Sequence, residues 1–340
     1  SPPDDAQAAC PPARNWTFRP ATRSPILSAH ESEAHVSPGR TRASALAVVL
    51  PFAAVIGATC AFQVGASLAK GLFPAVGAEG AAALRLILGA GMLMAVLRPW
   101  RNWPGAVALG PLVGLGVATG GAILFFYLAI GRLPQGVAIA LQFLGPLGVA
   151  IAGSRRASDL VWAALAAAGV WGLVGHGLTA GGADRLDLLG VVFALAAAAS
   201  WAAYIVWGQA ASRAYGHATP ALAVGIAAVM VVPVGIHHAG LEALLQPHLL
   251  PLALVVALIS TAIPFTLEMY ALPRMPARTF AVLTSLEPAF GALAGLLLLH
   301  ERLAPAQLAG VLAVMAAAAG AAWSSQPRTP EDLASDIPPT

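Results

Sequence analysis

Charged side chains are scarce in this sequence. Asp, Glu, Lys and Arg together make up 10% of its 340 residues, whereas hydrophobic residues make up 58%. Soluble domains carry about 25% charged residues, so this composition predicts a membrane protein. The formal net charge is only +3, and no run of basic residues occurs. The sequence therefore gives little support to nucleic acid as a partner.

Motifs for metals, disulfides and nucleotides are also lacking. The two cysteines, Cys10 and Cys60, form no disulfide framework and no metal motif. His237 and His238 have no Cys, Asp or Glu clustered with them. No Walker motif occurs, and the Ser-x-x-Lys match that begins at Ser67 lacks the companion motifs of an acyl-enzyme. We therefore expect no cofactor, no metal and no enzymatic activity, and ATP is not the energy source within this chain.

The two ends of the chain are polar. Residues 1–43 are rich in Pro, Ala, Ser, Arg and acidic residues and contain no apolar run, which predicts a disordered tail. Because this tail lacks an apolar h-region, we do not expect a signal peptide in it. Residues 326–340 form a second polar tail.

Ten apolar segments are long enough to cross a bilayer core, which needs about 20 mostly apolar residues per helix. In the first half they are 44–66, 74–97, 106–131, 134–153 and 158–178, and in the second half they are 187–211, 219–239, 249–273, 277–299 and 305–325. The connections are short and leave no room for a separate soluble domain. The sequence therefore predicts an all-α membrane protein with ten transmembrane helices.

Two stretches of the chain are weak copies of each other. LPQGVAIALQFLGP, residues 133–146, and MPARTFAVLTSLEP, residues 275–288, each hold two prolines at the same spacing. They begin the fourth and the ninth span, which is the same place in each set of five. Because five is an odd number, the second set must lie upside down relative to the first. We therefore expect two inverted five-helix repeats, 44–178 and 187–325, as in many secondary transporters.

The distribution of basic residues in the loops predicts the orientation. The side shared by both termini carries Arg40, Arg42, Arg98, Arg101, Arg155, Arg156, Arg213, Arg274, Arg278 and Arg328, and the opposite side carries Lys70, Arg132, Arg185 and Arg302. Because cytoplasmic loops are the richer in Lys and Arg, both termini are expected in the cytoplasm.

Arg85 stands in the middle of the second span, with apolar neighbours on every side. A charge at this depth is costly, so such residues usually face a partner or a wet cavity. One interpretation is that Arg85 attracts a substrate carboxylate. The other is a structural ion pair or a backbone clamp between helices.

Two carboxylates lie beside prolines at membrane depth. Glu268 follows Pro264 by one helical turn, and Glu287 directly precedes Pro288. Proline opens a helix because it has no N–H to donate. A carboxylate at such a break either binds an ammonium group, exchanges a proton, or is simply neutralised by packing.

The equivalent of Glu287 in the first half is Gly145, before Pro146, and Gln142 is the polar residue one turn earlier. The halves are therefore chemically unequal, which suits a site for one asymmetric substrate.

Further polar and aromatic side chains repeat at near-helical spacing. Gln63, Ser67 and Lys70 are candidates to line a cavity, and for Lys70 the favoured alternative is that it reaches the outer interface. Trp201 and Tyr204 share one face of the sixth span. They either stack on a substrate or contact lipid and neighbouring helices.

The chain resembles the drug/metabolite transporter superfamily, and within it the EamA family. The resemblance runs from about residue 46 to residue 325. It rests on FQVGASLAKGLFPAVGAEG, LRLILG, FYLAIG, VAIALQFLGPLGVAIAGSRR, SWAAYIVWGQ and ISTAIPFTLEMYALPRMPARTFAVLTSLEPAFGALAGLLLLHERL. These segments are similar to the family's bacterial inner-membrane exporters of threonine and homoserine. The resemblance implies proton-driven export of small amino acids from the cytoplasm. The chain departs from that pattern at Gln142, where the exporters tend to have an acidic residue.

The hypothesis that follows is alternating access around a site near the bilayer midplane, between the two halves. Gln63, Ser67 and Gln142 would hydrogen-bond the substrate, and Pro146 and Pro288 would supply the bends. The expected partners are a small-molecule substrate and membrane lipid, with the protein a monomer or a homodimer. The alternatives are the same fold exporting aromatic or sulfur amino acids, nucleobases or cationic compounds, and, from another class, a lipid flippase.

Overall fold

A computed structural model describes residues 38–102, 105, 109–152, 159–179, 187–271, 274–275 and 277–324. The chain divides into two compact units, residues 1–43 and residues 44–340. Most of the predicted N-terminal tail and all of the C-terminal tail lie outside the described residues. So do several of the arginines behind the predicted orientation.

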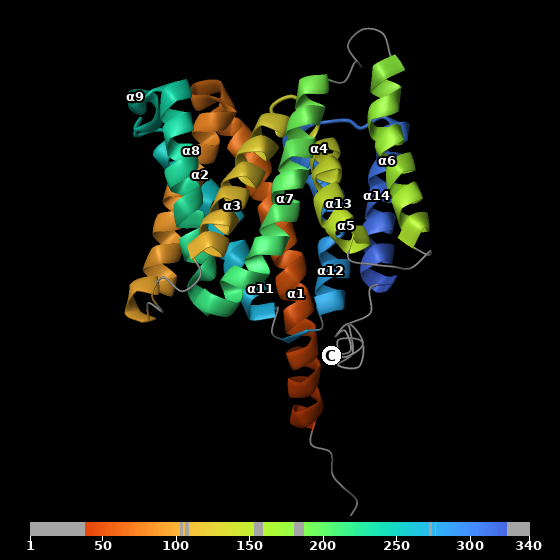
Figure 1. The fold of residues 1–340 in the computed structure, drawn as a ribbon, viewed down its shortest axis with the longest axis horizontal. Helices are drawn as coiled ribbons and strands as arrows, with labels where there is room; N and C mark the ends of the chain where they lie inside the picture. The colour runs from red at the N-terminus through yellow and green to blue at the C-terminus, as the bar shows by residue number, and fades with distance from the viewer. Residues whose placement is uncertain are drawn as a thin grey trace, which may run out of the picture. The chain divides into compact units, whose positions relative to one another are not determined.

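Every regular element in the described residues is helical (Figure 1). The longer helices of the first half are α1 (Pro38–Ala69), α2 (Phe73–Leu97), α3 (Leu109–Ile130), α4 (Gln135–Gln142), α5 (Leu144–Ala152) and α6 (Asp159–Thr179). Those of the second half are α7 (Leu188–Tyr215), α8 (Thr219–Ala239), α9 (Leu241–Leu244), α10 (Leu250–Ala257), α11 (Ile263–Ala271), α12 (Ala277–Thr284), α13 (Glu287–Leu299) and α14 (Pro305–Ser324). Short turns join some of them: the 3-10 turns η1 (Lys70–Leu72), η2 (Pro99–Asn102) and η4 (Gly216–Ala218), and the π-helical turn η5 (Leu258–Ala262). The all-α prediction is confirmed for this part of the chain, and α1 includes the last six residues of the predicted tail, 38–43.

Seven segments of the described chain are long and apolar enough to cross a membrane. Two of them are unusually long, Val49–Leu97 with 49 residues and Leu188–Ala239 with 52, and a shorter apolar helix covers Leu160–Val174. A multi-span membrane protein is therefore confirmed by length and composition. The division into ten spans and two inverted repeats stays a prediction.

Helices from the two halves of the chain pack against each other. The main pairs are α2 with α8, α3 with α7, α6 with α14, α3 with α8, and α4 with α13. Figure 1 shows α2 beside α8 and α6 beside α14. The largest apolar core joins α2, α3, α4, α7 and α8 through buried residues that include Leu86, Tyr127, Val137, Ala194 and Val224. Small residues permit these close approaches. A Cβ on Gly120, for example, would lie 3.3 Å from the Cα of Ala227.

Three membrane segments are interrupted in the middle. One consists of α4 and α5, which meet at Phe143, and a second consists of α12 and α13, which are separated by Ser285 and Leu286. In the third, η5 lies between α10 and α11. Interruptions of this kind free backbone carbonyls at membrane depth, which is typical of functional sites.

Candidate functional site

The breaks in the α4–α5 and α12–α13 segments have the same local cause. Pro146 cannot donate to the carbonyl of Gln142, and Pro288 cannot donate to the carbonyl of Thr284, because proline has no N–H. Gln142 is the last residue of α4, and Thr284 is the last residue of α12. Each helix therefore ends where its proline removes the next hydrogen bond.

The two broken segments cross in contact. A Cβ on Gly136 would lie 2.8 Å from the Cα of Ala292, and a Cβ on Gly291 would lie 2.6 Å from the Cγ2 of Ile139. Along this antiparallel contact α4 runs toward its end at Gln142, while α13 runs back toward its start at Glu287. The crossing therefore extends toward both breaks.

Polar side chains are buried at these breaks. Gln142 is 3% exposed and Glu287 is 4% exposed. The Oε1 atom of Gln142 accepts no hydrogen bond from the described residues. A buried acceptor without a donor is costly, so this oxygen is well suited to a donor on a bound molecule.

Glu268 of α11 is near enough to act electrostatically on both Glu287 and Tyr204. Glu268 and Tyr204 are half-buried, and the ring of Tyr204 lies 6.2 Å from that of Trp201. The structure therefore groups Trp201, Tyr204, Glu268 and Glu287, which come from α7, α11 and α13. An acidic group with aromatic walls is chemically suited to an ammonium ion.

Gln63 and Ser67 of α1 lie together, but they bind a residue that the sequence analysis missed. Ser67 donates to the Oε1 atom of Gln135 at 2.8 Å. The Nε2 atom of Gln135 donates to the backbone oxygen of Gln63 at 2.8 Å and to its side-chain oxygen at 3.1 Å. All three residues are buried. Gln135 therefore joins α1 to the start of α4.

This polar cluster continues to an ion pair. Glu301, just after α13, accepts a hydrogen bond from the backbone N–H of Gln135 at 2.7 Å and pairs with Lys70. A carboxylate is favourable at the start of a helix, where backbone N–H groups lack partners. Lys70, for which the outer interface was the favoured of two interpretations, is bound to Glu301 with 19% of its side chain exposed.

Arg85 is buried, with 4% exposure, and is hydrogen-bonded to three neighbours. Its Nη2 atom donates to the carbonyl of Ser260 at 2.8 Å, its Nε to the hydroxyl of Thr261 at 3.2 Å, and its Nη1 to the hydroxyl of Tyr127 at 3.4 Å. The guanidinium carbon also lies 5.7 Å from the ring of Phe62, the neighbour of Gln63. The carbonyl of Ser260 is in the π-helical turn η5, so Arg85 does clamp an irregular stretch of backbone.

The charge of Arg85 is nevertheless not neutralised by a carboxylate in the described residues. A guanidinium has five N–H donors, and the three bonds above occupy one donor on each nitrogen. The remaining donors are suited to a carboxylate, which a guanidinium binds with two parallel hydrogen bonds.

Apart from Gln142, Pro146 and Pro288, the predicted residues fall into three groups. Gln63 and Ser67 lie with Gln135, the aromatic pair lies with the two carboxylates, and Arg85 lies at η5. Gln135, Glu301 and Thr261 were missed. The signal for Gln135 and Glu301 was their position, because Gln135 follows the first proline of the repeat and Glu301 lies two residues before the end of the last segment that carries the resemblance. In the part of the chain that the structure describes, no group of three or more His, Cys, Asp or Glu could hold a metal ion.

Comparisons with known proteins agree with this architecture. The profile of the EamA-like transporter family matches residues 188–323. Threonine/homoserine exporter RhtA of Escherichia coli (strain K12) is 46% identical over 273 residues, which cover 80% of this chain and 91% of that protein. RhtA of Salmonella typhimurium (strain LT2) is 45% identical over 283 residues, covering 83% of this chain and 94% of that protein.

Two further similarities are more distant. The uncharacterized transporter YwfM of Bacillus subtilis (strain 168) is 30% identical over 250 residues, covering 68% of this chain and 80% of that protein. One solved crystal structure aligns with a TM-score of 0.50 and 20% identity over 81% of this chain and 95% of the other. The second similarity concerns the fold alone.

Proposed function

Because the chain belongs to the EamA-like transporter family, we propose that it is a secondary transporter that exports threonine, homoserine and similar small amino acids across the bacterial inner membrane. The observation that carries this proposal is the 46% identity to a threonine/homoserine exporter over 80% of this chain and 91% of the relative. All three groups of polar residues described above lie between residues 46 and 325, where the sequence resembles those exporters.

Ten spans are supported by the breaks inside the two long apolar segments. The first is interrupted by η1 and by Gly77, which has a φ of 70°, and the second is interrupted at Gly216, which has a φ of 52°. If each long segment is two spans, the seven candidates become nine, and the shorter helix Leu160–Val174 makes ten. The count is even, so both termini lie on one side, which we propose is the cytoplasm.

The pairing of helices supports two inverted halves. An axis that exchanges the halves maps the second span on the seventh, the fourth on the ninth and the fifth on the tenth. The corresponding helices are packed in these pairs: α2 with α8, α4 with α13, and α6 with α14. The third span pairs with the sixth through α3 and α7. The same axis maps this pair on the eighth and first spans. These spans are in contact through α11 and α1, where Val55 and Ala271 are buried together.

Two of the three groups of polar residues, together with Gln142, suit the parts of an amino acid. Arg85 binds the carboxylate with its remaining donors, and Glu287 or Glu268 binds the ammonium group or exchanges it for a proton. The unpartnered oxygen of Gln142 accepts from the substrate's hydroxyl or ammonium group. Trp201 and Tyr204 form a wall of the site.

The arrangement of breaks and contacts supports the proposal of alternating access. The cluster of Gln63, Ser67, Gln135, Glu301 and Lys70 ties α1, α4 and the end of α13 together at the side away from the termini. We therefore interpret this state as closed toward the outside. The breaks before Pro146 and Pro288 would let the inner and outer parts of their spans tilt separately.

The test of the proposal is transport in inside-out membrane vesicles, where an exporter accumulates its substrate. Labelled threonine should accumulate when a proton gradient is imposed, and threonine amide, which lacks the carboxylate, should compete poorly. Arg85→Ala should abolish accumulation. A transporter of cationic compounds would instead accept the amide and tolerate Arg85→Ala, and either result would refute the proposal.

A further inference from the structure

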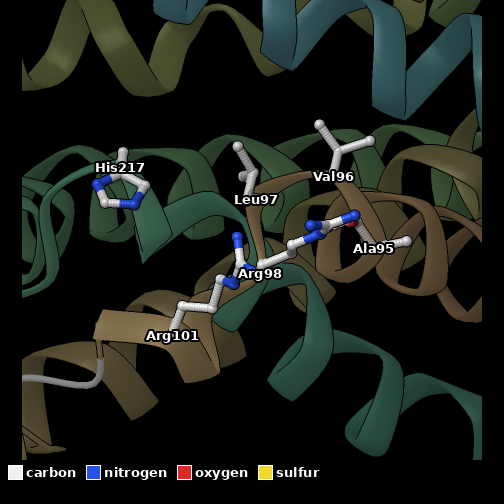
Figure 2. A pocket seen from close by; sticks show the side chains of 6 residues that line it. All are labelled: Ala95, Val96, Leu97, Arg98, Arg101 and His217. Atoms are coloured by element: carbon white, nitrogen blue, oxygen red, sulfur yellow. Dashed lines mark hydrogen bonds between the residues drawn. The ribbon is translucent and has the colours of Figure 1, made fainter.

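A pocket of about 480 Å³ lies at the end of α2, apart from the polar groups described above. It is lined by Ala95, Val96, Leu97, Arg98, Arg101 and His217, whose side chains Figure 2 shows. These residues come from α2 and its C-cap Arg98, from η2 and from η4. The pocket therefore lies where the second span ends beside the connection between α7 and α8.

The pocket has basic groups and no acidic residue in its lining. Arg98 and Arg101 form no ion pair with an acidic residue that the structure describes. Among the described residues, Arg98 makes one side-chain hydrogen bond, from its Nε to the carbonyl of Ala95 at 3.3 Å. Both arginines are exposed, so their other donors are open to an anion, and a phosphate group, like a carboxylate, is an anion that arginine binds with two parallel hydrogen bonds.

The backbone holds the two arginines in place. Arg98 ends α2 in the left-handed region, with φ 45° and ψ 57°, and its N–H donates to the carbonyl of Met94 at 2.9 Å. The N–H of Arg101 then donates to the carbonyl of Arg98 at 3.0 Å. Glycine is the usual residue in this conformation, and a residue with a side chain there is strained. An arginine at a position suited to glycine is consistent with a role for its side chain.

The neighbouring residues place the pocket at the level of lipid headgroups. Trp100, between the two arginines, is 61% exposed. Exposed tryptophan at the end of a span is typical of the membrane interface. The pocket also lies on the side that the loop arginines assign to the cytoplasm, where anionic lipids attract basic groups. These observations favour a lipid over a free anion as the source of the phosphate group.

From this pocket we infer a binding site for the phosphate headgroup of one anionic phospholipid. Arg98 and Arg101 bind the phosphate oxygens, and the apolar side chains of Val96 and Leu97 contact the glycerol and the start of the acyl chains. The site is separate from the substrate pathway and does not depend on the proposed export function.

Binding of individual lipids to the purified full chain tests this site, and native mass spectrometry can count them. Phosphatidylglycerol, phosphatidylcholine and inorganic phosphate are titrated separately. The test variant is Arg98→Gly with Arg101→Gln, because glycine suits the positive φ and removes the guanidinium without new strain. Phosphatidylglycerol should bind the wild type more tightly than phosphatidylcholine does. The variant should lose about fivefold in affinity for each arginine removed.

Arg213→Gln is the matched control, since Arg213 is an exposed arginine in the last turn of α7 that does not line the pocket. It should keep the wild-type affinity for phosphatidylglycerol. An equal loss in this control would show general charge attraction and would overturn the site. Unchanged binding by the double variant would overturn it too, and inorganic phosphate that displaces the lipid at equal concentration would overturn the assignment to a lipid.

Discussion

The break between α4 and α5 and the break between α12 and α13 have the same backbone cause, but they carry different side chains. Both helices end at the residue whose carbonyl a proline leaves without a partner, Gln142 in one and Thr284 in the other. At the position before the proline, the first half has Gly145 and the second half has Glu287. The duplicated feature is therefore the interruption of the helix, and the charge belongs to one copy.

Packing explains why the first copy cannot carry a side chain there. A Cβ on Gly145 would lie 2.1 Å from the backbone oxygen of Ala198 in α7. A backbone atom cannot move aside as a flexible side chain can, so even a methyl group does not fit. The fold therefore excludes a carboxylate at residue 145, and of these two equivalent positions only residue 287 carries one.

The largest effect is expected from Gly145→Ala, which adds the smallest side chain to the first copy. Overpacking against the carbonyl of Ala198 should lower the free energy of unfolding by about 3 kcal/mol. Thermal unfolding of the purified protein in detergent measures the change. Gly148→Ala in the same helix is the control, because a Cβ there would meet nothing within 4 Å. Equal midpoints for both variants would contradict the packing argument.

Glu287→Gln should remove the charge that distinguishes the second copy while keeping its shape. If Glu287 binds the ammonium group or exchanges a proton, threonine accumulation in inside-out vesicles should fall about tenfold or more, since a hydrogen bond to a charged group is lost. Glu242→Gln, at an exposed carboxylate in α9, should transport at the wild-type rate. Wild-type transport by Glu287→Gln would remove this carboxylate from the mechanism.

Gln142→Met tests the polar residue of the first copy. Because the Oε1 atom of Gln142 has no donor in the described structure, an apolar side chain of similar shape should leave stability unchanged or raise it by about 1 kcal/mol. Threonine transport should still fall, because the substrate loses its acceptor. Lower stability together with unchanged transport would mean that Gln142 serves the fold.

The smallest effect is expected where the second half begins. Asp187 caps α7 by accepting from the N–H of Leu189 and pairs with Arg132 at 2.8 Å. The hydrogen bond from Arg132 lowers the pKa of the Asp187 carboxyl. A carboxyl group whose pKa is lower in the folded state than its ordinary value of about 3.9 stabilises the fold at pH values above about 3.9. This stabilisation is lost as the pH falls through the folded-state pKa.

Asp187→Asn should therefore be slightly less stable than the wild type at neutral pH, and the difference should vanish in acid. Asparagine still caps a helix, so the variant isolates the charge. Thermal unfolding at a series of pH values measures the stability difference at neutral pH and its loss in acid. A difference that persists below about pH 3 would contradict the assignment to the ion pair.

Much of the local structure was predictable because its causes are local. A proline at membrane depth removes one identifiable hydrogen bond, so the prolines indicated where the fourth and ninth segments would be interrupted. Membership of the EamA family was carried by short sequence segments and is confirmed. The partners of the polar residues were not predictable. Gln135 binds Gln63 across 72 positions of the chain, and such a contact depends on how each helix is rotated.

An all-helical membrane protein of this family could be predicted from the sequence, because the length of an apolar segment, its prolines and its short motifs can each be read within that segment. The tertiary structure was needed to show that Arg85 holds the carbonyl of Ser260 with no neutralising carboxylate among the described residues, and that residue 145 must be a glycine. Both depend on atoms from helices distant in the chain. A buried charge finds its partners, and a glycine its neighbours, only when the two halves have packed together.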